Sequence, residues 1–313
     1  MALAWAAWVC ICVVWGTTYL AIRVALETVP PFVMGAMRWI VAGVILTLAL
    51  RLRREPWPPL GQWPGFALSG LLLIGLGNGG VVWAEQFVPS GLAAVVVATV
   101  PFWMVAVEAA HPSGERITAG TVAGLVVGFG GIVLLVWPEL ERGGAAAARF
   151  AWGVVALQVA CAGWALGSAY AKRHAPRTGI ASASALQMVF GGLMMLAAGL
   201  AAGEHRHVAF SARSASAVIY LTLAGSVGAF LAYGYALRHL PISTVSLYAY
   251  VNPMIAVVLG AAVLSEPLGT RIALATVLVL AGSAIVQMSG TAGIWRYRLS
   301  TNRLVRRARE PRP

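Results

Sequence analysis

The sequence predicts an all-α membrane protein with ten transmembrane helices in two inverted five-helix repeats. Three observations support this prediction. The 313 residues are 60% hydrophobic and only 10% charged, whereas a soluble domain carries about 25% charged residues. Ten apolar stretches are each long enough to cross a bilayer, which takes about 20 helical residues. The last five stretches also repeat features of the first five. This composition excludes a soluble enzyme, a disordered chain and a secreted disulfide scaffold.

The predicted spans follow one another with connections of at most 13 residues. A backbone surrounded by lipid must satisfy its own hydrogen bonds, which favours helices. Stretches such as residues 122–137 also lack the two-residue alternation of barrel strands. Arg38 is the one charged residue inside the spans. The spans are residues 2–22, 32–50, 64–84, 89–107, 118–137, 151–171, 180–202, 214–237, 242–264 and 272–289.

The basic residues predict the orientation, because Lys and Arg concentrate in cytoplasmic loops. If the N-terminus is cytoplasmic, the cytoplasmic loops and the tail hold 15 of the 22 basic residues and the outer loops hold 6. Both termini are therefore predicted to lie in the cytoplasm, and residues 290–313 form a basic cytoplasmic tail. We assign the net charge of +12 to topology and to contact with anionic membrane lipid. Nucleic acid is not a predicted partner, because no nucleic-acid-binding fold accompanies the arginines.

Residues 1–142 and 146–289 align as two repeats. Pro89 and Pro101 stand twelve residues apart in the fourth span, as Pro241 and Pro253 do in the ninth. Five is an odd number, so the second repeat must enter the membrane from the opposite side. Inverted repeats are typical of secondary transporters, which bind solute near the midplane and alternate access to it. Other matched pairs are Trp15 with Trp164, Arg23 with Lys172, and Arg38 with Gln187.

This plan resembles a known family. The repeated Pro–x11–Pro helix, followed each time by a glutamate (Glu115 and Glu266), resembles the EamA-type transporters of the drug/metabolite transporter superfamily. Residues 77–104, GNGGVVWAEQFVPSGLAAVVVATVPFWM, are similar to the YedA- and YddG-like exporters within it. The resemblance implies export of amino acids or related small metabolites across a bacterial-type inner membrane. We expect the two glutamates to cap the N-termini of the fifth and tenth spans, where a carboxylate complements the helix dipole.

Arg38 is the most informative single residue. A charge at membrane depth costs about 2.5–3.5 kcal/mol on insertion scales, so it should face the bundle interior or water. One interpretation is a site for a substrate carboxylate, since Arg presents a planar bidentate fork. The other is a structural arginine that pairs with helix-end carbonyls or with Glu85. Gln187 is its uncharged match, so a site built on both would be asymmetric.

Aromatic and amide side chains complete the predicted substrate site. Trp15 and Trp164 are expected to face one another across the pseudo-axis, where they would gate a cavity or stack on a solute. The alternative is that both pack against neighbouring helices or lipid. The remaining candidates for substrate binding are Tyr248, Asn252, Asn78, Trp83 and Gln187.

Two prolines and one glutamate have predicted mechanical roles. Pro101 and Pro253 are expected to kink the fourth and ninth spans and to free a carbonyl one turn earlier, which favours a place beside the path. Glu85 ends the third span and is a candidate for carrying a coupling proton. The alternative, which is the commoner role of such a residue, is a solvated helix-end acid. The second repeat has Leu237 at the matching position, so Glu85 is not a paired element, and proton exchange and facilitated diffusion both stay open.

Glycine patterns predict close helix packing. The GxGxxG motif of residues 75–80 follows no strand and is not read as a dinucleotide site. Gly120, Gly124 and Gly128 favour tight packing of the fifth and tenth spans, or a homodimer contact. The three cysteines have no zinc-site spacing. No cofactor and no metal are predicted.

Several functional alternatives remain at this stage. The same fold could carry a drug, a nucleotide-sugar or a lipid-like metabolite, or form a passive channel. An intramembrane enzyme is not favoured, because paired ionisable groups at membrane depth are missing from the sequence.

Overall fold

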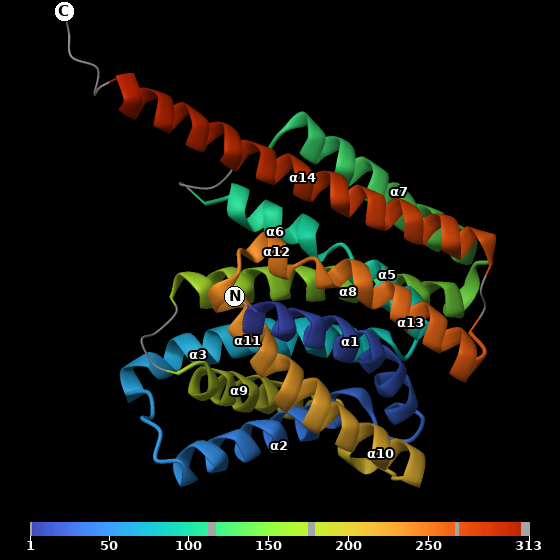
Figure 1. Ribbon diagram of the computed structural model, residues 1–313. Coiled ribbons are helices and arrows are strands. Elements are labelled where there is room, and N and C mark those ends of the chain that lie inside the picture. The colour runs from blue at the N-terminus through green and yellow to red at the C-terminus, as the bar shows by residue number, and fades with distance from the viewer. Residues whose placement is uncertain (1, 112–116, 175–178, 267–268, 308–313) are drawn as a thin grey trace, which may run out of the picture.

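The structure is a computed structural model that describes residues 2–111, 117–174, 179–266 and 269–307 (Figure 1). The side chains of residues 140, 242 and 243, and those from residue 290 onward, are not described. Within these ranges the secondary structure is helical and no strand occurs.

The first half of the chain forms five spans. The third is one continuous rod in which a π-helical segment, η2, joins two α-helices, and the fourth consists of two helices. The elements are α1 (Ala2–Ala25), α2 (Pro31–Leu52), the short η1 (Leu60–Gln62), α3 (Trp63–Gly70), η2 (Leu71–Asn78), α4 (Gly79–Ala84), α5 (Ser90–Val97), α6 (Val100–Ala109) and α7 (Ala119–Glu141).

The second half repeats this succession, with a π-helical segment, η4, again in its third span. The turn between the halves uses Gly143 and Gly144, both at positive φ, a conformation that glycine adopts without steric cost. The elements are α8 (Gly144–Arg173), α9 (Ile180–Ala201), the short η3 (Glu204–Arg206), α10 (Ala212–Tyr220), η4 (Leu221–Gly228), α11 (Ala229–His239), α12 (Ile242–Val245), α13 (Tyr248–Leu264) and α14 (Thr270–Arg307).

The ten predicted spans correspond to these elements. In the described chain, nine helical rods are long and apolar enough to cross a membrane, and α13, a shorter apolar helix of 17 residues, belongs to the remaining span, the ninth. The prediction of an all-α membrane protein is therefore confirmed. Two boundaries differ: α8 begins ahead of the predicted residue 151, and α14 continues through most of the predicted tail.

The two prolines lie differently in their spans. Pro101 occupies the second position of α6, directly after the break between α5 and α6, where the missing N–H leaves no helical bond unmade. Pro253 lies inside α13, and the ninth span is interrupted earlier, ahead of Tyr248. The interruption expected at Pro253 is thus displaced toward the N-terminus, and the two kinks are not equivalent.

Matched helices of the two halves pack against each other. In Figure 1, α7 and α14 lie side by side at one edge of the bundle, and α2 and α9 lie together at the opposite side. Between them, α1 contacts α13 and α11, while α8 contacts α6 and η2. Each half therefore completes its packing with helices of the other half, and the interface between the halves runs through the centre.

The small residues of α7 allow its close approach to α14. A Cβ added at Gly124 would lie 2.6 Å from the carbonyl oxygen of Gly282, and one at Gly282 would lie 2.4 Å from the amide nitrogen of Gly128. The expected tight packing of the fifth and tenth spans is confirmed. Because this glycine ridge is covered within the chain, it does not support the predicted homodimer. The GxGxxG segment packs likewise, with Gly80 against Ala160.

A methyl group at Gly124 should therefore destabilise the fold. We expect Gly124→Ala to lower the free energy of unfolding in detergent by about 1–3 kcal/mol, because the backbone opposite can yield only by separating the helices. Thermal unfolding followed by tryptophan fluorescence measures this. Gly130→Ala is the matched control on the same helix, since nothing lies within 4 Å of its added Cβ. Equal stability of the two variants would contradict the packing described.

Candidate functional site

Two cavities lie inside the bundle. The larger, here called the vestibule, has a volume of about 460 Å³. The smaller, here called the inner cavity, has a volume of about 70 Å³. The inner cavity is lined by Trp15, Thr18, Tyr19, Ile22, Arg38, Trp39, Gly77, Asn78, Val81, Val97, Val100, Ala160, Cys161, Trp164, Tyr248 and Asn252.

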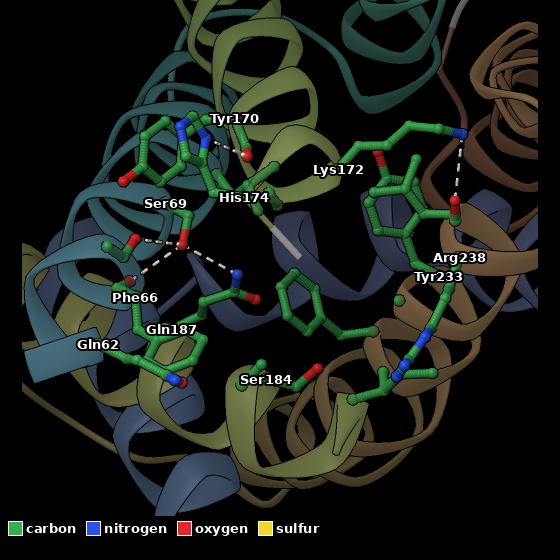
Figure 2. A pocket seen from close by; sticks show the side chains of 18 of the residues that line it. Gln62, Phe66, Ser69, Tyr170, Lys172, His174, Ser184, Gln187, Tyr233 and Arg238 are labelled. Atoms are coloured by element: carbon green, nitrogen blue, oxygen red, sulfur yellow. Dashed lines mark hydrogen bonds between the residues drawn. The ribbon is translucent and has the colours of Figure 1, made fainter. Parts of the chain in front are cut away.

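The vestibule lies at one end of the third, sixth and eighth spans (Figure 2). Its lining includes Gln62, Lys172 and Arg238, which belong to the connections predicted to be cytoplasmic. His174 also lies there, and neither aspartate nor glutamate is among the described residues that line it. The vestibule is therefore an electropositive chamber on the side of the membrane that the basic residues assign to the cytoplasm.

Four aromatic side chains separate the vestibule from the inner cavity. This aromatic layer consists of Trp15, Trp164, Tyr233 and Tyr248. The ring of Trp15 lies 5.3 Å from Trp164, 5.2 Å from Tyr233 and 5.3 Å from Tyr248, centroid to centroid. Tyr233 lines the vestibule while the other three line the inner cavity. Trp15 and Trp164 thus face one another, as the repeat predicts.

Hydrogen bonds fix the aromatic layer in place. The indole Nε1 of Trp164 donates to the Tyr233 hydroxyl at 3.2 Å, and that hydroxyl also bonds the Ser168 Oγ at 2.7 Å. The indole Nε1 of Trp15 donates to the carbonyl of Gly225 in η4 at 3.1 Å. Rings held by such bonds form a defined barrier, because each polar edge has a partner inside the apolar interior.

Arg38 is buried beside the inner cavity. Its side chain is 2% exposed, its Nε donates to the Ser226 Oγ at 2.7 Å, and its guanidinium carbon lies 4.6 Å from the Trp39 ring centre. The Nη1 atom is buried with no hydrogen-bond partner among the described residues. A buried donor without a partner costs about 1–3 kcal/mol, more for a charged group. This atom therefore has hydrogen-bonding capacity that no described residue uses.

Two amides complete the inner cavity. The Oδ1 of Asn78 accepts from the indole Nε1 of Trp39 at 2.8 Å. The amide nitrogen of Asn252, in its satisfied orientation, donates to the carbonyls of Tyr248 and Cys12 at 3.1 and 2.9 Å. Asn78 thus bonds one neighbour and Asn252 bonds two, and both amides keep further hydrogen-bonding capacity at the lining of the cavity.

The two halves use matched polar contacts with each other. Arg38 on α2 bonds Ser226 in η4, and its repeat partner Gln187 on α9 donates from Nε2 to the Ser69 Oγ on α3 at 2.9 Å. In each case the second span of one half bonds the third span of the other. Gln187 lines the vestibule instead of the inner cavity, so the candidate site is asymmetric, as the sequence indicates.

A second matched contact closes the end of the third span in each half. A guanidinium nitrogen of Arg23 donates to the backbone carbonyl of Glu85, at the end of α4. Lys172 Nζ donates to the carbonyls of Leu237 and Leu240, at the end of α11, at 3.3 and 3.1 Å. Cations at helix C-termini satisfy free carbonyls and complement the dipole. These two basic residues therefore stabilise the fold.

Glutamates cap helix N-termini across the interface between the halves. Glu266 accepts from the Ser90 N–H and Oγ at 2.8 Å each and from the Gly91 N–H at 3.0 Å. The expected cap of the tenth span is therefore wrong, because Glu266 caps α5, in the fourth span. Glu204 likewise accepts from the Val33 N–H of α2 at 2.9 Å, and partial burial raises the pKa of its carboxyl. Glu115 lies outside the described residues.

Glu85 is not a solvated acid. Its side chain is 0% exposed, and neither carboxyl oxygen has a hydrogen-bond partner among the described residues. The expectation that Arg38 pairs with it is also not met, since Arg38 bonds Ser226 and Glu85 takes part in none of the ion pairs found in the described chain. The carboxyl is therefore buried with no hydrogen-bond or ion-pair partner among the residues that the structure describes.

The structure brings six of the eight predicted binding residues to one place. They are Trp15, Arg38, Asn78, Trp164, Tyr248 and Asn252. Trp83 lies elsewhere, with its ring centre 5.2 Å from that of Phe87, so its predicted role in the cavity has no support. The residues around Trp83 are apolar on every side of the third span, so the sequence does not indicate which face of that span turns inward.

Sequence reasoning missed Ser226 and Tyr233. Ser226 holds Arg38, and Tyr233 forms the vestibule side of the aromatic layer. One signal could have found them: both are polar groups within an apolar span, and such groups require partners inside the bundle. That signal does not name the partner, because many small polar residues share it.

A bundle of apolar spans around an internal cavity that holds a few polar groups is typical of a membrane transporter. The chain belongs to the EamA-like transporter family, whose model matches residues 3–137 and 151–288. It is 37% identical over 257 residues to the uncharacterized inner membrane transporter YedA of Escherichia coli K12, covering 82% of this chain and 81% of that one. It is 23% identical to the uncharacterized transporter YvbV of Bacillus subtilis 168, covering 90% of each.

The fold also has a counterpart among solved structures. One protein crystal structure superposes with a TM-score of 0.65 over 93% of this chain and 99% of its own, at 19% identity. This likeness supports the fold and carries no statement about the solute.

Removing the Tyr233 ring should open the inner cavity to the vestibule. Cys161 lines the inner cavity and is 1% exposed, so it reports access once Cys10 and Cys12 are replaced by serine. We expect Tyr233→Ala to speed labelling of Cys161 by a small maleimide roughly tenfold, which corresponds to about 1.4 kcal/mol of barrier. Tyr233→Phe keeps the ring and should label nearly as slowly as the parent. Equal rates for Ala and Phe would show that Tyr233 is not the barrier.

Proposed function

We propose that this protein is a secondary transporter that exports amino acids or related small metabolites bearing a carboxylate. The observation that carries the proposal is the buried guanidinium of Arg38, whose Nη1 lacks a partner beside a small cavity. Membership of a transporter family supports the general activity. The relative YedA, named as an inner membrane transporter, supports an inner-membrane location.

The inner cavity suits a small solute with one carboxylate. Arg38 would bind the carboxylate through its planar fork, since charge-assisted bidentate pairs are the strongest polar contacts that a side chain offers. Trp15, Trp164 and Tyr248 would pack against the rest of the solute. Their ring faces would also attract an ammonium group at about 0.5–2 kcal/mol, which fits an amino acid without requiring an acidic partner.

Alternating access would follow from the two inverted repeats. The vestibule provides a route to the aromatic layer from the predicted cytoplasmic side, and its lysine and arginine would attract an anion. Rocking of the halves against each other would then expose the inner cavity to the other side. The contacts that cross between the halves, such as Glu266 with Ser90, are those that such a motion would remake.

The topology belongs to the same proposal. Both termini would lie in the cytoplasm, so that the arginine-rich end of the chain meets anionic lipid at the inner leaflet. A homodimer stays a prediction of the sequence. No described residue argues for nucleic acid as a partner.

Arg38→Gln tests the proposed solute class, and it also recreates the residue that the second half carries at Gln187. We expect binding of carboxylate solutes to fall about tenfold to hundredfold, since a hydrogen bond to a charged group is worth about 1.5–3 kcal/mol. Purified protein in liposomes is assayed for binding and transport of a panel of amino acids, each beside its uncharged amide analogue. Binding of the amide analogues should change little.

Arg213→Gln is the matched control, because Arg213 is an exposed arginine in a surface pair with Glu27. It should transport like the parent protein. An Arg38→Gln protein that still prefers acid to amide as strongly as the parent would overturn the assignment of Arg38. Parent protein that moves no amino acid or metabolite of the panel would overturn the proposed function itself.

A further inference from the structure

The Glu85 carboxyl stands out among the ionisable groups that the described chain buries. Both of its oxygens are shielded from solvent without a hydrogen-bond donor among the described residues. Glu85 is also the C-cap residue of α4, where the negative end of the helix dipole opposes a carboxylate. Burial without a partner and the dipole both favour the neutral carboxylic acid over the ion.

The second half of the chain shows that the fold does not require this carboxyl. There, Lys172 donates to the carbonyl of Leu237 just as Arg23 donates to the carbonyl of Glu85. Leu237 is itself buried, at 7% exposure. The same helix end is therefore closed in the same way with a leucine at the glutamate's position. Glu85 is therefore an acid buried at an unfavourable site, and the second half has no acid at the matching position. A residue of this kind calls for a functional explanation.

The surroundings of Glu85 can accommodate a change of charge. The charged and titratable groups that act on it are Arg23 and Tyr19 of α1, Arg38 of α2, and Glu266 in the segment after α13. Two cations face it against one acid, and Arg23 already contacts its backbone. Tyr19 both lines the inner cavity and interacts electrostatically with Glu85, so it links the carboxyl to the candidate solute site.

We propose that Glu85 is the proton-binding site of this transporter, taking up and releasing one proton in each cycle in exchange for solute. This inference rests on the proposed function. In the conformation described, the carboxyl holds its proton. Release of the proton to water on one side leaves a carboxylate, which Arg23 can pair with by leaving the end of α4. Protonation would thus select between two arrangements of α1 and α4, next to the cavity.

Infrared spectroscopy of the purified protein tests the protonation state without any solute. At neutral pH we expect a carboxylic-acid C=O band that is absent in Glu85→Gln and still present in Glu108→Gln. Glu108 is the matched control because it is a half-exposed glutamate paired with Arg173 at 2.8 Å. A spectrum in which Glu85→Gln removes no such band would overturn the inference, whatever the solute proves to be.

Transport in liposomes tests the coupling. With one-for-one exchange, a pH gradient of one unit can sustain about a tenfold solute gradient, because the two represent the same free energy. We expect the parent and Glu108→Gln proteins to build this gradient. Glu85→Gln should build none, yet still exchange labelled for unlabelled solute. Glu85→Leu introduces the residue that the second half has at the matching position. It is a second test of the coupling in case the glutamine variant does not fold.

The outcomes separate the two proposals. A solute gradient driven by the pH gradient in either Glu85 variant would overturn the role of Glu85. A parent protein that exchanges solute but builds no solute gradient in response to the pH gradient would overturn it as well. Parent protein that exchanges no solute would overturn the proposed function, and the infrared band would then decide the protonation of Glu85 by itself.

Discussion

A polar group inside the bilayer is costly unless it finds a partner within the protein, and the rest of the structure depends on that constraint. The two halves satisfy it for one another. The polar residue of each second span bonds a serine in the third span of the opposite half. Within each half, a basic residue of the first span closes the end of the third. Glutamates of the second half cap helices of the first. The contacts that stabilise the bundle are thus largely contacts between repeats.

Departures from this symmetry locate the candidate functional residues more sharply than burial does. Arg38 stands where the second half has Gln187, and Glu85 stands where it has Leu237. In both pairs the uncharged residue makes the same structural contact as its charged match. Gln187 donates to the Ser69 hydroxyl, and the Leu237 carbonyl accepts from Lys172. The fold therefore does not require the charge on Arg38 or on Glu85. Since an intramembrane charge is expensive, such an unneeded charge indicates solute binding or proton coupling.

The sequence predicts the spans well and their inner faces poorly. Hydropathy and helix length fix which residues cross the membrane, and the repeat pairs Trp15 with Trp164 correctly. Which face of a span turns inward depends on contacts between distant helices, and the spans are apolar on all sides. Trp83 was therefore misplaced, and Ser226 and Tyr233 were missed. The same limit explains why Glu266 was expected at the wrong helix. A helix end can be capped by any segment that tertiary packing brings to it, and the sequence does not show which segment that is.

The relative sizes of the two cavities bear on how such a protein would avoid leaking. The vestibule is roomy and electropositive, whereas the inner cavity is small and is bounded on the vestibule side by four rings, three of which have hydrogen-bonded edges. A wide path through both would conduct, as a channel does. A narrow inner cavity behind a barrier of fixed rings would admit solute only when the halves move. Because those rings come from α1, α8, α11 and α13, and so from both repeats, relative motion of the repeats is also what would part them.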